Sequence, residues 1–312
     1  MKMPPQPYSF LEVTLVLSVN LLEIYQCRKG KYMISNDLIE RIERTALKLR
    51  LDILEMVGVG KAGHLGGSSS CADIVAALYF YKMKIDPENP HYEDRDRFLL
   101  SKGHGALAQY AALVELGYIP RDEMKKVKTL DGILQGHPDM TKTPGIEANT
   151  GSLGQGLSIA TGMALGLRLD GKDSRVYVIV GDGELSEGQI WEAAMCAGYY
   201  KLDNLVAIID NNGLQATGPI KERFNIYPIA PKWESFGWHV REIDGHNIRE
   251  IIETLDELDN VRGKPKVMIA RTVKGKGFSF AENDPAFHNI ALTEEQYIQA
   301  KRELESRMAR WS

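Results

Sequence analysis

Apolar and polar positions follow two different periods along this chain. Apolar residues recur every three to four positions, as in helices, over 37–57, 72–83, 104–116, 156–169, 187–200, 248–258 and 293–308. Short continuous apolar runs, typical of buried strands, lie between them at 98–101, 176–180, 205–210, 239–243 and 266–270. This alternation predicts an α/β fold: a doubly wound, mainly parallel sheet with helices on both faces.

Two of the predicted strands end in residues suited to a divalent cation. Gly181-Asp182-Gly183 closes one strand, and Asp210-Asn211-Asn212 closes the next. Parallel strands bring their carboxyl ends to one edge of the sheet, so we expect Asp182, Asn212 and the carbonyl of Leu214 to lie together. These oxygen donors suit Mg²⁺, and the oxygens of a diphosphate would complete its octahedron.

The helix that begins after this first strand adds an anion site. Its amino terminus presents main-chain N–H groups and a partial positive charge, and Gly181 and Gly183 let the main chain approach an anion closely. Gly-Asp-Gly also occurs in turns and calcium loops, so the motif alone is weak.

Six segments together are far more specific than this one motif. They are Lys61-Ala-Gly-His64-Leu-Gly-Gly67, Leu100-Ser-Lys-Gly-His104-Gly105, Leu134-Gln-Gly-His137-Pro-Asp139, Thr150-Gly-Ser-Leu-Gly-Gln-Gly156, the unit from Gly181 to Asn212, and Thr272-Val-Lys-Gly-Lys-Gly277 followed by Phe287-His288. With these segments in this order, the chain resembles the thiamine-diphosphate enzymes, and among them the transketolase family, from about Arg50 to Met308.

The resemblance implies one half of an enzyme. Single-chain transketolases continue into a domain that binds the cofactor's pyrimidine ring and supplies its activating glutamate, whereas here one amphipathic segment, 293–308, follows the diphosphate domain, which we assign to residues 33–312. The chain therefore resembles the N-terminal subunit of a split transketolase. We expect a partner, the C-terminal transketolase subunit, with which it forms a heterotetramer, and ketol transfer should require both chains.

The resemblance also implies roles for residues in the motifs. His104, Gly183 and His288 would contact the diphosphate of thiamine diphosphate, and Gly151 and Leu153 would offer main-chain groups to its aminopyrimidine. Asp182, Asn212 and Leu214 would hold Mg²⁺, with Ca²⁺ or Mn²⁺ as substitutes, while Gly181 and Asn212 would also line the cofactor site. His64 and His137 would exchange protons with a sugar-phosphate substrate near neutral pH.

These residues also have structural alternatives. Flanking glycines place His64, His104 and His137 on tight turns where packing alone rarely needs an imidazole, whereas His91 and His239 have no motif around them, and His246 suits a turn before a helix. Glu187 and Glu192 could be an acidic first turn and a solvated face. In the family, matching glutamates connect two active sites through shared protons, which is the role predicted here.

Composition fits a cytoplasmic enzyme subunit. The net charge of −4 gives no basic footprint for nucleic acid, and the three cysteines (Cys27, Cys71 and Cys196) have no metal-ligand spacing. Residues 1–32 differ from the rest: the apolar part is too short to span a membrane, and we interpret them as an atypical extension or an over-called start before Met33.

Three functions remain open from the sequence. The first is the transketolase subunit, working in the pentose phosphate pathway or on an unusual ketose phosphate; the groups that grip the sugar phosphate would belong to the partner. The second is the α subunit of a thiamine-dependent 2-oxo-acid dehydrogenase, which should lack the segments around His104 and His137. The third is a non-catalytic thiamine-diphosphate-binding protein, which the intact motif residues disfavour.

Overall fold

The computed structural model describes residues 34–311. The chain divides into two units between Glu40 and Arg41, and the description below concerns the larger one, residues 41–312. The interpretation of residues 1–32 lies outside the described residues. Among those described, no helix has the length and apolar character needed to cross a membrane.

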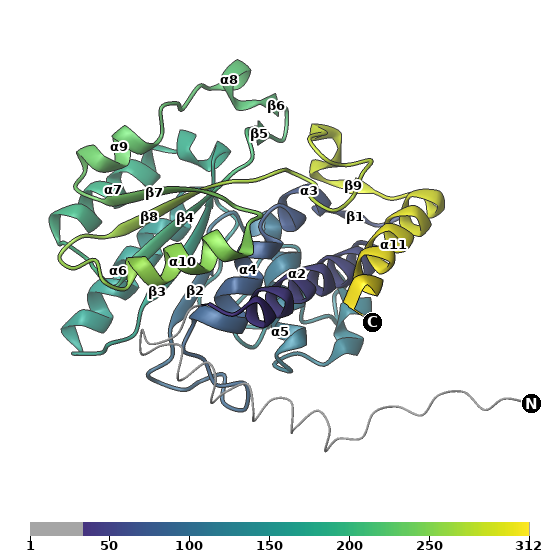
Figure 1. The fold of residues 1–312 in the computed structure, drawn as a ribbon, viewed down its shortest axis with the longest axis horizontal. Helices are drawn as coiled ribbons and strands as arrows, with labels where there is room; N and C mark the ends of the chain where they lie inside the picture. The colour runs from purple at the N-terminus through teal and green to yellow at the C-terminus, as the bar shows by residue number, and fades with distance from the viewer. Residues whose placement is uncertain (1–33, 312) are drawn as a thin grey trace, which may run out of the picture. The chain divides into compact units, whose positions relative to one another are not determined.

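A five-stranded parallel sheet forms the centre of the larger unit (Figure 1). Its strands, in spatial order, are β2 (Arg97–Leu100), β3 (Val176–Gly181), β4 (Leu205–Asn211), β8 (Lys266–Arg271) and β7 (His239–Asp244). Val178 pairs with Ala207 and Ile208 with Met268, so the carboxyl ends of β3, β4 and β8 lie level at one edge. The strands β3, β4 and β8 are almost wholly buried because helices cover both faces.

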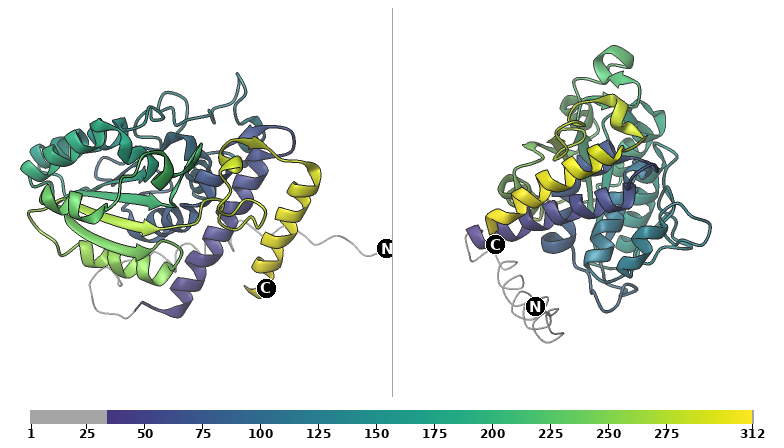
Figure 2. Two further views of the ribbon diagram at one scale, coloured as in Figure 1. Left: turned by 90° about the horizontal axis from the view of Figure 1, so that it is seen from above. Right: turned by 90° about the vertical axis from the view of Figure 1, so that its right-hand side faces the viewer.

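Alternate residues of each strand face different helical layers. Val176, Val178 and Val180 of β3 belong to one core with α6 (Gln155–Leu169), α7 (Gly188–Tyr199) and α9 (Ala230–Ser235). On the other face lie α4 (Ala72–Ala77) and α10 (Ile248–Leu258), which pack against each other. Figure 2, seen from above, shows the sheet between the teal α6–α7 layer and the light green α10. The predicted α/β fold with a parallel sheet is confirmed.

Five further α-helices lie in the described part of the chain. They are α2 (Asn36–Val57), α3 (Leu65–Ser69), α5 (Ala106–Glu115), α8 (Ile220–Arg223) and α11 (Glu294–Met308), with short 3-10 turns η2 (Gly103–Gly105), η3 (Arg121–Lys126), η4 (Gly183–Ser186), η5 (Pro285–His288) and η6 (Ala309–Trp311). Two short antiparallel pairs complete the set: β1 (Ala62–Gly63) with β9 (Ile290–Ala291), and β5 (Leu214–Gln215) with β6 (Gly218–Pro219).

One predicted helix has a different form. The segment 72–83 is not a single α-helix, because α4 continues as a π-helical stretch, η1 (Leu78–Lys82). The wider turn accompanies bonds from the Tyr81 hydroxyl and the Lys82 ammonium to the Asp256 carboxylate, at 2.6 and 2.7 Å. Polar contacts with α10 thus coincide with the change of helical period.

Candidate functional site

Four histidines converge beside the carboxyl edge of the sheet. The ring of His64 lies 5.5 Å from that of His104, 6.1 Å from that of His137 and 5.4 Å from that of His288, and the last is 5.0 Å from His104. The antiparallel pairing of β1 with β9 explains part of this arrangement, because His64 directly follows β1 and His288 closely precedes β9. Residues from four predicted motifs therefore share one site.

These imidazoles are held in the neutral form. Burial lowers the pKa of His64 to about 4, with help from the charge of Lys128, and burial together with Lys102 lowers the pKa of His104 to about 2. Burial and Lys274 lower the pKa of His288 to about 4; the pKa of the more exposed His137 is shifted the same way by partial burial and Lys128. A neutral imidazole can both donate and accept a hydrogen bond, which suits contacts with hydroxyl groups.

Two buried polar atoms near the histidines have hydrogen-bonding capacity left. Nδ1 of His288 and Oγ1 of Thr150 have no hydrogen-bond partner among residues 34–311. Buried polar groups are normally paired, so these atoms indicate a place where a bound molecule supplies the partner.

The predicted metal ligands lie together at the next strand ends. Oδ1 of Asp182 accepts from the Gly183 N–H at 2.8 Å, and Oδ2 accepts from the Gly213 N–H at 2.5 Å, which joins the ends of β3 and β4. Asn212 and Leu214 line the same cavity as Asp182. The Leu214 carbonyl also accepts from the Lys274 ammonium at 3.3 Å, which leaves one of its two lone pairs for a cation.

Asp182 carries the electrostatic signature expected of a cation site. Its side chain is buried, and burial together with the negative charge of Asp210 raises its pKa to about 7. In the described part of the chain no basic side chain forms an ion pair with it. A divalent cation would compensate this buried carboxylate. The structure contains no group of three or more His, Cys, Asp or Glu side chains arranged for a metal among its described residues, so this mixed donor set stays a prediction.

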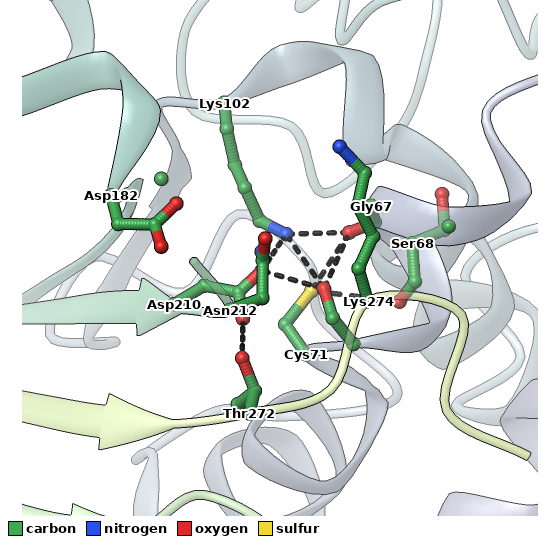
Figure 3. A network of polar contacts seen from close by, with 12 residues as sticks. Gly67, Ser68, Cys71, Lys102, Asp182, Asp210, Asn212, Thr272 and Lys274 are labelled. Atoms are coloured by element: carbon green, nitrogen blue, oxygen red, sulfur yellow. Dashed lines mark hydrogen bonds and ion pairs between the residues drawn. The ribbon is translucent and has the colours of Figure 1, made fainter. Parts of the chain in front are cut away.

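Next to Asp182 and Asn212 lies a buried ion pair that the sequence did not predict (Figure 3). The ammonium of Lys102 contacts Oδ2 of Asp210 at 2.5 Å and the Gly67 carbonyl at 2.5 Å. Asp210 also accepts from Ser70 Oγ at 2.6 Å, from Thr272 Oγ1, and from Asn212 Nδ2 at 3.3 Å. The last bond turns the Asn212 amide nitrogen toward Asp210, so the ion pair orients a predicted metal ligand.

Removing one partner of this pair should cost much stability. Lys102→Met leaves Asp210 buried without its cation, and such losses typically cost about 3–5 kcal/mol. We expect chemical denaturation to show this loss. Lys172→Met is the matched control, because Lys172 pairs with Asp94 at 2.6 Å on the surface, where an ion pair contributes little to stability. Equal losses in the two variants would contradict the importance of the buried pair.

Lys274 is a second cation that the sequence patterns did not reveal. It is 2% exposed, and within residues 34–311 its ammonium donates only to main-chain oxygens, those of Leu214 and Gln215 at 3.3 and 3.2 Å. Burial and the charge of Lys102 lower its pKa to about 8. Both lysines occur in the predicted motifs, Lys102 two residues before His104 and Lys274 directly before Gly275, and this position was the only sequence signal for them.

Glu184 was also missed, although it directly follows the Gly-Asp-Gly motif. Its buried carboxylate accepts from Ser101 Oγ at 2.5 Å, from the Gly154 N–H at 2.8 Å and from the Gly181 N–H at 3.1 Å. It therefore ties the start of α6 and the segment after β2 to the end of β3.

A cavity of about 300 Å³ opens between these groups. It is lined by His104, His288, Lys102, Lys274 and the three predicted metal ligands, together with Leu153, Gly181, Gly183 and Glu187. His64 and His137 lie beside it through their ring contacts, and Gly151 packs on His137: a Cβ at Gly151, where φ is +135°, would lie 2.6 Å from the His137 ring. Glu192 lies farther along the exposed side of α7 and does not line the cavity.

Comparisons with known proteins show what this chain is similar to. Residues 42–309 match the family model described as transketolase, thiamine diphosphate binding domain. The 6-deoxy-6-sulfo-D-fructose transketolase subunit SqwG from Clostridium sp. (strain MSTE9) is 47% identical, with 85% of this chain and 96% of that protein covered. An apulose-4-phosphate transketolase subunit from Phocaeicola vulgatus is 43% identical, with 86% and 96% covered.

Longer proteins match over less than half of their own length. Transketolase from Rattus norvegicus is 38% identical over 87% of this chain but only 44% of its own length. A crystal structure of transketolase from Pichia stipitis with sedoheptulose-7-phosphate has a TM-score of 0.81 and 32% identity, and the match covers 85% of this chain and 41% of that one.

Proposed function

We propose, from the premise that this chain belongs to the transketolase family, that it is the diphosphate-binding subunit of a two-chain transketolase dependent on Mg²⁺. The enzyme would transfer a two-carbon ketol unit from a ketose phosphate to an aldose phosphate. The observation that carries the proposal is the convergence of four neutral histidines with the uncompensated Asp182 carboxylate in and beside one cavity.

The residues present fit thiamine diphosphate and a divalent cation. Asp182, Asn212 and the Leu214 carbonyl would hold the metal, and Lys274 and the main chain at Gly183 would face the diphosphate. The unpaired Nδ1 of His288 supports a ligand at this point. The proposed metal is Mg²⁺, with Mn²⁺ or Ca²⁺ as substitutes.

When bound, thiamine diphosphate supplies the electron sink for breaking and forming the carbon–carbon bond. The proposed work of this chain is binding and proton handling. His104 and His288 would contact the cofactor, and Gly151 and Leu153 would face its aminopyrimidine. His64 and His137 would donate to and accept from substrate hydroxyls, for which their neutral form is suited.

A C-terminal partner chain would complete the site. Relatives named as subunits match nearly their whole length to this chain, whereas the rat transketolase extends well beyond the match. The cavity opens at the carboxyl edge of the sheet, where Leu153 is 36% exposed beside the proposed cofactor position. We propose that the partner's pyrimidine-binding domain docks there, that two such pairs form a heterotetramer, and that the complex acts on sugar phosphates in the cytoplasm.

A two-substrate assay tests the function class. The complex with its partner, loaded with thiamine diphosphate and Mg²⁺, is given ribose 5-phosphate with either xylulose 5-phosphate, apulose 4-phosphate or 6-deoxy-6-sulfo-D-fructose as donor. Ketol transfer from at least one donor supports the proposal. Oxidation of a 2-oxo acid with an electron acceptor, without ketol transfer, would replace it with the dehydrogenase subunit; cofactor binding without either activity would leave a binding protein.

Glu187 gives a further prediction. It is exposed at the start of α7 and lines the cavity, and we propose that it shares a proton across the contact between cofactor domains, with Glu192 farther along the same helix. Glu187→Gln should lower kcat of the complex by about 10- to 100-fold, at or below the usual contribution of a general acid–base group. Unfolding should be unchanged. Glu305→Gln on α11 is the control, and unaltered kinetics in Glu187→Gln would remove the claim.

A further inference from the structure

The segment that carries Lys274 is held by its main chain on both sides. The Val273 N–H donates to Nε2 of His246 at 2.8 Å, and the Lys276 carbonyl accepts from Nε of Arg50 at 2.9 Å. The Gly275 N–H between them donates to the Gly66 carbonyl at 3.1 Å. The Lys274 carbonyl itself accepts from the Asn283 N–H at 2.9 Å. The position of the Lys274 backbone is therefore held by groups from α2, α3, the loop before α10 and the loop before η5.

Arg50 and His246 meet on one buried carboxylate. Arg50 contacts Asp73 through both terminal nitrogens, at 3.0 and 2.6 Å, and Nδ1 of His246 lies 2.7 Å from Oδ2 of Asp73. Arg50 and Asp73 are 4% and 7% exposed. Burial alone would raise the pKa of Asp73, but the Arg50 charge and the bonds from His246 and Arg50 hold that pKa well below its usual range.

The hydrogen bonds also determine which nitrogen of His246 carries the proton. Nε2 accepts from a main-chain N–H, so in the neutral ring Nδ1 carries the hydrogen and donates to Asp73. His246 does not line the cavity of the candidate site. It is also not the cap of α10, because Asn247 provides that cap. Its two bonds connect Asp73 to the chain next to Lys274.

An ordinary structural ion pair is the alternative for these three residues. Two features favour a more specific role. First, Arg50 and His246 each form a hydrogen bond with the main chain of 273–276. Second, the packing there is close: a Cβ at Gly277 would lie 2.8 Å from Cδ of Arg50, and one at Gly66 would lie 3.1 Å from Cγ of Lys274. Lys274 contacts no carboxylate in the part of the chain that the structure describes, so the position of its ammonium depends on its backbone.

We propose that Arg50, Asp73 and His246 are positioning residues that hold Lys274 at the diphosphate site. The inference rests on the proposed function, because the diphosphate is what Lys274 would meet. None of the three residues lines the cavity that His104 and His288 line. They act through the segment 272–277, which joins β8 to the loop before η5.

The test uses Arg50→Lys in the complex of this chain with its partner. Lysine can keep a charge contact with Asp73 but cannot also reach the Ser69 and Lys276 carbonyls, which Arg50 contacts at 3.1 and 2.9 Å. Calorimetric titration with thiamine diphosphate in Mg²⁺ should show a Kd about tenfold higher, a change of about 1.4 kcal/mol. At saturating cofactor, kcat should stay within about twofold. Hydrogen exchange of amides 272–277 should be faster even without cofactor.

Arg95→Lys is the matched control. Arg95 holds Glu147 through two bonds of 2.8 Å and contacts the Tyr92 carbonyl at 2.9 Å, and it lies just before β2, at the amino edge of the sheet. It should lose similar thermal stability while the Kd for thiamine diphosphate and the exchange of 272–277 stay unchanged. If both variants changed the Kd and the exchange of 272–277 equally, the network of Arg50, Asp73 and His246 would contribute only to general stability, and the inference would be overturned.

The outcomes separate this inference from the proposed function. If the unaltered complex does not bind thiamine diphosphate, the proposed function fails, while the exchange of 272–277 still measures the positioning. If the unaltered complex binds and Arg50→Lys matches it in Kd and exchange, the positioning claim is wrong. Should Arg50→Lys not fold, His246→Ala replaces it, because it removes only the bonds to Asp73 and Val273 and should speed exchange next to Lys274.

Discussion

Asp182→Ala should abolish Mg²⁺-dependent binding of thiamine diphosphate and with it ketol transfer. Mutation of a residue that only supports a metal ligand typically lowers metal affinity by about 10- to 100-fold. Loss of the sole proposed carboxylate ligand should therefore lower the affinity by more than about 100-fold. The reason lies in its surroundings: Asp182 is buried with two main-chain N–H groups, and Asn212 and Leu214 contribute only neutral oxygens.

Metal-free stability distinguishes this loss from misfolding. The raised pKa of Asp182, about 7, means that its charged form destabilises the folded chain when no cation is bound. Without Mg²⁺, Asp182→Ala should therefore have a Tm equal to or above that of the unaltered chain. Adding Mg²⁺ and thiamine diphosphate should raise the Tm of the unaltered complex only. Asp170→Ala, at the exposed end of α6, is the control. Normal cofactor binding by Asp182→Ala would refute the metal site.

The second large effect concerns the partner. The purified chain alone should show no detectable ketol transfer at any concentration of cofactor, and adding the C-terminal subunit should restore it. The physical reason is that the cavity contains the residues proposed to bind the diphosphate and the metal, whereas the pyrimidine-binding domain is proposed to belong to the other chain. Titration of the partner against a fixed amount of this chain, followed by product formation, measures the effect; activity should stop rising at equal amounts.

A chain that transfers ketol units by itself would contradict this prediction. Inactive mixtures would be informative only with a cofactor-binding control, so the binding of thiamine diphosphate to each chain and to the mixture should be measured in parallel. Binding that is much tighter in the mixture than in either chain is the expected pattern, because the interface would close the site.

Elements with a clear period were predictable from the sequence. The strands β3 and β4 are apolar runs that end in motif residues, and α10 begins and ends where its apolar pattern does. Glycine-rich and short elements were not: α3 consists of Leu65-Gly-Gly-Ser-Ser69, and the pairing of Ala62 with Ala291 depends on contacts between distant parts of the chain. Local patterns contain no information about such pairings.

The site was predictable to the extent that motifs mark it. Flanking glycines identified His64, His104 and His137, which the structure brings together, and the strand ends located Asp182 and Asn212. Lys102 and Lys274 were not recognised, because their roles come from burial next to other charges, and a sequence pattern does not show burial of a lysine. The bond from Lys274 to the carbonyl of Leu214 likewise depends on how the loops fold.

The short ribbon of β1 and β9 has a consequence for biosynthesis. It ties residues 62–63 to residues 290–291 and so helps to bring His64 to His288. Residues up to 291 must therefore be synthesised before this pocket can form, while the strands β2 to β4 can already pair on the emerging polypeptide. Premature termination before codon 288 would yield a product that retains much of its hydrophobic core and lacks a working pocket.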